Sequence, residues 1–146
     1  MSTYMVLGHR VTPLHTVGDY ALIEVVSAPQ VPGPPPHLHE EASEFFYISE
    51  GSLEITVDSE TRTLQQGESL CLRPGQVHTF INTTDRDVRW ITGWSPRGFE
   101  QFFEDFGVAV EEPEALQKSV AEELIQDVIL RCEKYGMTIA TKSGPA

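Results

Sequence analysis

Short runs of β-forming residues, separated by turn residues, dominate the chain between residues 20 and 96. Turn signals rich in glycine, proline, asparagine and aspartate recur about every eight to twelve residues, a spacing typical of antiparallel sandwiches and barrels. The pattern predicts strands over residues 20–26, 45–48, 52–57, 61–64, 69–72, 78–81 and 88–94. We therefore expect an all-β domain built from antiparallel strands.

The pattern changes twice along the chain. Residues 28–36 hold five prolines and one glycine, and proline removes the backbone donors of a strand ladder, so we predict a stiff extended connection there. After Pro96, helical spacing predicts a short helix over 99–106 and a single longer helix over 114–135, ended by Gly136. We predict one domain over 1–146, with a barrel at about 15–96, C-terminal helices at about 98–136 that cover it, and an irregular tail at 141–146.

Three histidines and one glutamate have the spacing of a metal site. Two residues apart on a strand, His37 and His39 project to the same face. Glu44 opens the next apolar run, and His78 opens another after a turn signal at 73–75. Three strands can thus bring three imidazoles and a carboxylate to one point. His9 and His15 lack such partners, and we interpret them as ordinary surface or core residues.

The two segments that carry these residues resemble the two motifs of the cupin family. The first runs from Gly33 through the His-x-His pair and Glu44 to Gly51, and the second runs from Gly67 through Gly75 and His78 to Asn82. The first motif is short by two residues and filled with prolines, and the second has Arg73 where the family usually has proline. Neither departure touches an expected ligand. The resemblance covers about 20–96 and implies a jelly roll, also called a double-stranded β-helix.

Strand alternation predicts what surrounds the site. Side chains that share a face with Glu44 or His78 point inward, whereas Phe45 and Tyr47 face outward. The predicted substrate pocket therefore contains Phe46, Ile48, Phe80, Trp90 and Trp94, with Thr92 on the same face as the tryptophans. The alternative for each of these side chains is that it fills the packed interior of a small barrel. An apolar pocket around a metal suits an aromatic or polyketide-like ligand better than a sugar.

The predicted ligand set favours a catalytic rather than a structural metal. Three neutral imidazoles and one carboxylate leave one or two coordination positions open, and the lack of thiolate ligands argues against a closed zinc site. Mixed nitrogen and oxygen ligation admits Fe, Mn, Ni, Co, Cu or Zn, and affinity alone does not select among them. Glu44 is expected to be a ligand, with the role of catalytic base as the alternative.

Charge and composition exclude several partners. The formal net charge is −12, the ten Lys and Arg residues are scattered, and no basic cluster could neutralise phosphates, so we expect neither nucleic acid nor an anionic membrane as a partner. No apolar run approaches the length of a membrane span, and the first residues lack the pattern of a secretory signal, so we expect a cytoplasmic protein.

Three classes of function fit the sequence. The C-terminal aromatic segment from Gly98 and the motifs resemble small cupins similar to quercetin dioxygenases, which implies a metal-dependent oxygenase acting on a small aromatic substrate. Other cupins resemble polyketide cyclases, which implies a redox-neutral cyclase or isomerase with the metal as Lewis acid. A non-enzymatic binding or sensing module is the third class. The resemblance also implies a homodimer that pairs through an outer sheet face.

Overall fold

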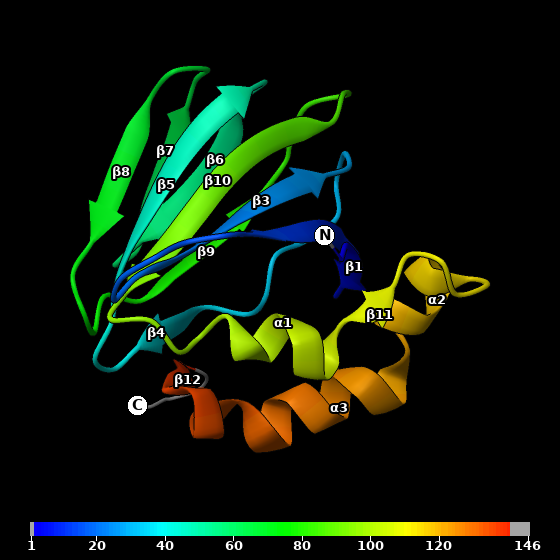
Figure 1. The fold of residues 1–146 in the computed structure, drawn as a ribbon. Coiled ribbons are helices and arrows are strands. Elements are labelled where there is room, and N and C mark those ends of the chain that lie inside the picture. The colour runs from blue at the N-terminus through cyan, green and yellow to red at the C-terminus, as the bar shows by residue number, and fades with distance from the viewer. Residues whose placement is uncertain (1, 141–146) are drawn as a thin grey trace.

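The computed structural model describes residues 2–140, which form two antiparallel β-sheets with a layer of helices at one end (Figure 1). The larger sheet has the order β11 (Val108–Ala109), β1 (Tyr4–Val6), β2 (His9–Leu14), β3 (Ala21–Ser27), β10 (Val88–Ser95), β5 (Ser43–Glu50) and β8 (Ser69–Leu72). The smaller sheet has the order β12 (Met137–Ile139), β4 (His37–His39), β9 (His78–Ile81), β6 (Leu53–Val57) and β7 (Glu60–Leu64). The predicted all-β fold is confirmed. The tail predicted at 141–146 lies outside the described residues.

The core lies between the two sheets, because their strands alternate between inward apolar and outward side chains. Strand β3 follows this period-two rule over its whole length, with Ala21, Ile23 and Val25 buried and the residues between them half-exposed. Strands β5 and β10 pair along their length, with Thr92 opposite Phe46 and Trp94 opposite Glu44. This register puts the inward residues of two neighbouring strands next to each other on the core face.

The sheets extend beyond the strands that the sequence predicts. Strand β9 begins and ends at the predicted residues, and β8 does the same, but β1 and β2 lie before the predicted start of the barrel at residue 15. After the helices the chain returns to the smaller sheet as β12, which pairs with β4 so that Met137 lies opposite His39. The C-terminal segment therefore contributes a strand beside two of the predicted metal ligands.

The predicted single helix over 114–135 is wrong, because the chain divides into α2 (Ala115–Ser119), α3 (Glu122–Arg131) and the 3₁₀ helix η1 (Cys132–Tyr135). The buried Ser119 explains the break: its hydroxyl donates to the Leu116 carbonyl at 2.7 Å and accepts from the Gly8 N–H at 3.1 Å. This contact fixes the end of α2 against the N-terminal strands. Ala121 is then extended, and α3 begins with two glutamates that favour a helix N-terminus.

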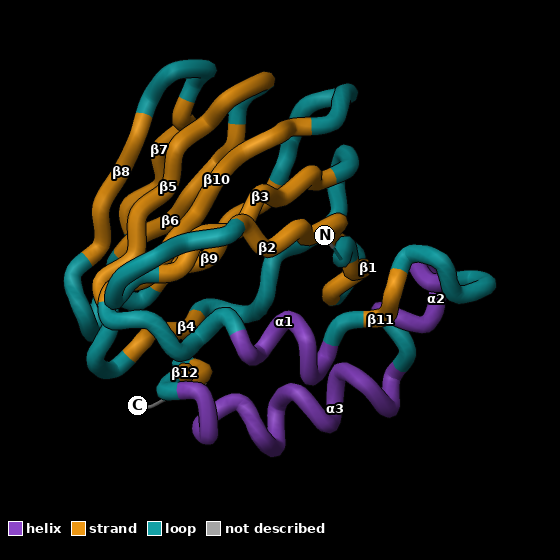
Figure 2. Tube along the Cα trace, viewed as in Figure 1, coloured by secondary structure: helices purple, strands orange, loops and turns teal. Residues whose placement is uncertain are grey.

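Helices α1 (Gln101–Phe106) and α3 lie across one end of the sheets, close to β4 and β12 (Figure 2). Three phenylalanines of α1, Phe102, Phe103 and Phe106, are buried, which attaches this helix to the core. The expectation that the helices cover the β-structure is confirmed for α1. None of the helices within residues 2–140 combines the length and the apolar character that a membrane crossing requires.

Candidate metal centre

The three predicted histidine ligands meet at one point between the sheets. His37 and His39 are the two ends of β4 and both are buried, whereas Leu38 between them faces the other way. His78 lies directly opposite His37 in the pairing of β4 with β9. One ring nitrogen from each histidine lies within 4.8 Å of the others, the arrangement that a single metal ion requires.

Backbone carbonyls hold two of these rings in place. The Nδ1–H group of His37 lies 3.0 Å from the Pro35 carbonyl oxygen, and the Nδ1–H group of His78 lies 2.9 Å from the Gln76 carbonyl oxygen. A histidine that donates through Nδ1 keeps the lone pair of Nε2 available for a metal, and such hydrogen bonds commonly orient metal-binding imidazoles. We therefore assign Nε2 as the metal-facing atom of both residues.

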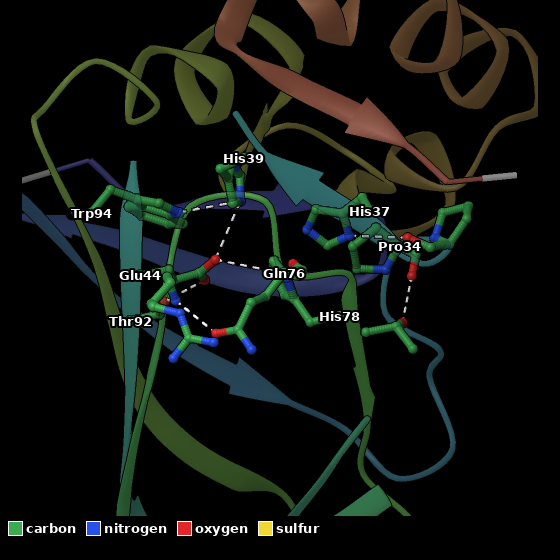
Figure 3. Close-up of polar contacts among 11 residues, drawn as sticks. Pro34, His37, His39, Glu44, Gln76, His78, Thr92 and Trp94 are labelled. Carbon is green, nitrogen blue, oxygen red and sulfur yellow. Dashed lines mark hydrogen bonds and ion pairs between the residues drawn. The ribbon is translucent and has the colours of Figure 1, made fainter. Parts of the chain in front are cut away.

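The Glu44 carboxylate projects from β5 toward the same point (Figure 3). Its Oε1 atom lies 3.0 Å from His78 Nε2 and 3.2 Å from His39 Nε2. The Thr92 hydroxyl donates to the other oxygen, Oε2, at 2.7 Å and so fixes the plane of the carboxylate. Glu44 thus lies beside the three histidines, as the sequence predicts.

The surroundings shift the protonation of two of these groups, His37 and Glu44, in ways that suit a cation. Burial, followed by the charges of His78 and His39, lowers the pKa of His37 to about 3, so that this imidazole is neutral near pH 7. Burial alone would raise the pKa of Glu44, but hydrogen bonds and charges from His39 and His78 outweigh it and lower the pKa below its ordinary value. The site therefore combines a neutral imidazole with an ionised carboxylate.

This donor set fits a divalent transition metal. Neutral imidazole nitrogens and a carboxylate oxygen bind iron, manganese, nickel, cobalt, copper and zinc alike. Glu44 is already held by Thr92, which resembles the outer hydrogen bonds that support metal-binding carboxylates. The His37, His39 and His78 triad can hold the ion, with Glu44 as the adjacent fourth group.

A cavity of about 80 Å³ adjoins the metal site and is lined in part by residues of the larger sheet. Three of the predicted pocket residues, Phe80, Trp90 and Trp94, line it together with His37, His39 and Glu44 of the metal site. Phe46 and Ile48 are not among its lining residues and fill the core instead, at 1% and 0% exposure. Inward alternation along β5 holds for Phe46 and Ile48, but alternation alone does not separate a core position from a cavity wall.

Several cavity residues were not singled out from the sequence. They include Phe99, Phe102 and Phe103 of the helical segment, Met137 of β12 and His9 of β2. The Phe99 ring lies 4.5 Å from the His39 ring, between centroids. The run of aromatic residues after Gly98 is a visible signal, but the sequence predicts that this segment covers the barrel and does not place its side chains in the cavity.

His9 lies in the cavity wall as part of a satisfied hydrogen-bond chain. The Trp90 indole N–H donates to Ser27 Oγ at 3.0 Å, and Ser27 Oγ lies 2.9 Å from His9 Nδ1. His9 Nε2 lies 2.9 Å from the Pro32 carbonyl oxygen, which can only accept, so the proton sits on Nε2 and Nδ1 accepts from Ser27. His9 is therefore a neutral core histidine, one of the two ordinary environments that the sequence suggested for it.

The hydrogen bonds of the buried His9 lead to a prediction about the stability of the protein in acid. Burial lowers the pKa of His9 below its ordinary value despite the opposing Pro32 hydrogen bond, so the unfolded chain takes up the proton first as pH falls. Stability contributed by neutral His9 is present above the unfolded pKa of about 6.5 and is lost below it. With chelator present, melting temperature should fall less between pH 7.5 and 5 in His9→Gln than in the unchanged protein. The exposed His15→Gln variant should match the unchanged protein; equal slopes in all three would contradict the assignment.

Comparison with known proteins agrees with the fold. Residues 23–94 match the family model described as a cupin domain. The structure is similar to an RmlC-like cupin from Shewanella frigidimarina, with a TM-score of 0.60 and 19% identity over 70% of this chain and 87% of the other. Residues 23–94 form a cupin domain, and the cupin resemblance of the two motifs, which lie within this segment, is confirmed.

Two curated relatives match a shorter segment. One is the polyketide synthase CurC from Streptomyces cyaneus, 35% identical over 60 residues that span 41% of this chain and 39% of the relative. The other is the probable oxidoreductase patJ from Penicillium expansum, 39% identical over 63 residues that span 41% of this chain and 19% of the relative. Because less than half of each relative is matched, these similarities concern the cupin segment alone.

Proposed function

We propose that this protein is a metal-dependent enzyme that acts on a small aromatic or polyketide-like substrate, with oxygenase chemistry as the first candidate. The observation that carries the proposal is the meeting of His37, His39 and His78 with Glu44 at the base of an aromatic cavity. A bound metal would supply Lewis acidity and, for a redox-active ion, a route for electrons to dioxygen. The probable oxidoreductase patJ supports this candidate.

The chain's own residues would bind and orient the substrate. Phe80 and Trp90 meet edge to face at 4.8 Å between centroids and form an apolar wall that favours a flat ring over a sugar. Phe99 packs against His39 and excludes water from that side of the site. The small cavity volume favours a compact substrate. Glu44, ionised and held by Thr92, serves as the fourth ligand in this proposal.

A redox-neutral cyclase or isomerase is the second candidate. The polyketide synthase CurC supports it, since a similar segment occurs in that protein. In this candidate the same cavity would fold a polyketide-like chain against the aromatic wall, and the ionised Glu44 carboxylate would accept a proton as base. The two candidates differ in whether dioxygen is consumed.

An oxygen electrode with a substrate panel separates the candidates. Protein loaded with Fe²⁺, Mn²⁺, Ni²⁺, Co²⁺, Cu²⁺ or Zn²⁺ would be offered flavonols and other hydroxylated aromatic compounds, with His78→Ala as the matched control. Oxygen uptake that requires His78 supports the oxygenase. Product formation without oxygen uptake supports the cyclase, and metal-dependent binding without turnover would replace both with a binding or sensing module.

A cytoplasmic location is part of the proposal. Cys71 and Cys132 are both free thiols, which fits a reducing compartment. The proposal includes neither nucleic acid nor a membrane as a binding partner, because the net charge of −12 disfavours binding to phosphate groups.

The proposal also includes a homodimer. Tyr47 is 38% exposed on the outer face of the larger sheet, next to the half-exposed Phe45 and Ile91, and these side chains form an apolar surface. We expect light scattering at micromolar concentration to give about twice the chain mass of 16.3 kDa. Tyr47→Glu should shift the mass toward the monomer, and a monomeric unchanged protein would contradict the dimer.

A further inference from the structure

Two neighbours make opposite demands on one atom of the metal site. The Trp94 indole Nε1 lies 3.3 Å from His39 Nε2, and Glu44 Oε1 lies 3.2 Å from the same nitrogen (Figure 3). The indole N–H can only donate and needs a lone pair, whereas the carboxylate needs a proton. One imidazole nitrogen offers a lone pair or a proton but not both.

Metal binding changes which partner Trp94 can use. If His39 binds through Nε2, the metal takes its only lone pair there, and the indole N–H must find another acceptor. Trp94 is 4% exposed, so bulk water does not serve this purpose. The rings packed against it, Phe99 at 5.0 Å and Phe103 at 5.6 Å between centroids, carry no oxygen or nitrogen. A buried donor left without an acceptor is unfavourable.

The position of Trp94 shows where the new acceptor must lie. Strand pairing sets Trp94 directly opposite Glu44, and its side chain lines the cavity that opens from the metal site. Its N–H group is thus close to His39 Nε2 and on the cavity side of the site. A substrate oxygen that faces the metal would occupy this region.

The second indole of the chain provides a contrast. Trp90 lines the same cavity, but its N–H donates to Ser27 Oγ at 3.0 Å and has a permanent acceptor within the protein. Trp90 therefore contributes only to the cavity wall, whereas the N–H group of Trp94 is available to a ligand once His39 Nε2 binds the metal.

We propose that the Trp94 indole N–H donates a hydrogen bond to the substrate oxygen bound at the metal, and thereby selects ligands that bind through oxygen. This inference rests on the metal site of the proposed function. It assigns Trp94 a role in substrate orientation, in addition to the apolar contact expected from the sequence.

Ligand binding to the Co²⁺-loaded protein tests the inference without any assay of activity. The two probes are 4-nitrocatechol, which binds metals through oxygen, and imidazole, which binds through nitrogen and leaves no free lone pair for Trp94. Visible spectra would give the dissociation constant of each. Trp94→Phe keeps the aromatic packing and removes the N–H group. We expect it to weaken 4-nitrocatechol binding by about tenfold to a hundredfold, the effect of losing a hydrogen bond to a charged oxygen, and to leave imidazole binding unchanged.

The outcomes separate this inference from the proposed function. Equal affinities of both proteins for 4-nitrocatechol would overturn the role of Trp94, and so would an equal loss for both probes, which would indicate packing alone. Failure of the unchanged protein to bind Co²⁺ would instead overturn the metal site itself.

A measurement in the unchanged protein covers the case in which Trp94→Phe does not fold. With ¹⁵N-labelled indoles and Zn²⁺ bound, the Trp94 N–H resonance should move downfield when acetate is added but not when imidazole is added. If the chemical shift of the Trp94 N–H group does not change at saturating acetate, the proposal is overturned.

Discussion

Replacing His78 by alanine should reduce the metal content of the purified protein to near zero. His78 Nε2 faces the site because its Nδ1 is held by the Gln76 carbonyl, and the ring is buried. Losing an outer hydrogen bond to a ligand costs about 10- to 100-fold in metal affinity, so losing the ligand itself should cost about 100-fold or more. The same result is expected for His39→Ala. Elemental analysis after gel filtration measures the metal per chain directly.

The exposed His15 supplies the matched control, because His15→Ala removes an imidazole that lies away from the site. It should leave the metal content unchanged. Full occupancy in both His39→Ala and His78→Ala would contradict the metal assignment. Glu44→Gln then separates the two roles of the carboxylate: reduced metal content indicates a ligand, and full metal content with lost turnover indicates a base.

The histidine cluster could be predicted from the sequence because it depends on short-range rules. The spacing of His37 and His39 fixes their common face once the segment is a strand, and a turn signal places His78 at the start of another. The motif resemblance then supplied the relative placement of the strands. The same alternation correctly put Trp90, Thr92 and Trp94 on one buried face of β10.

What could not be predicted depends on contacts between distant segments. The break between α2 and α3 follows from the contact of Ser119 with Gly8, which are 111 residues apart. The helical periodicity of the sequence does not indicate this contact. The return of the chain as β12 beside β4 is of the same kind, since a three-residue strand is too short to show a period. The return of the chain as β12 also brings Met137 to the cavity wall.

The division between core and cavity is the other limit of the sequence pattern. Phe46 and Trp90 are both inward by alternation and stack at 5.4 Å between centroids, yet Trp90 lines the cavity and Phe46 does not. The depth of a side chain between two sheets depends on how the sheets twist and pack, which a single strand does not encode. The assignment of Phe46 to the core therefore needs its own test.

Phe46→Ala should destabilise the protein by roughly 3–5 kcal/mol, the range for deleting a buried phenylalanine. The side chain is 1% exposed, stacks on Trp90 and meets the edge of the His78 ring at 6.1 Å, so its removal leaves a cavity below the metal site. Chemical unfolding monitored by circular dichroism gives the free energy of unfolding. The metal content at low temperature should persist, because Phe46 offers no ligand atom.

The control for this variant is Leu130→Ala, a similar truncation at a helix position that is 79% exposed. It should change the free energy of unfolding by less than about 0.5 kcal/mol, since surface substitutions away from special features have small effects. A loss below about 1 kcal/mol for Phe46→Ala would mean that this side chain borders open space rather than the packed core. In that case Phe46 would be a residue of the cavity wall, as alternation along β5 predicts from the sequence. The substrate site would then extend beneath the metal.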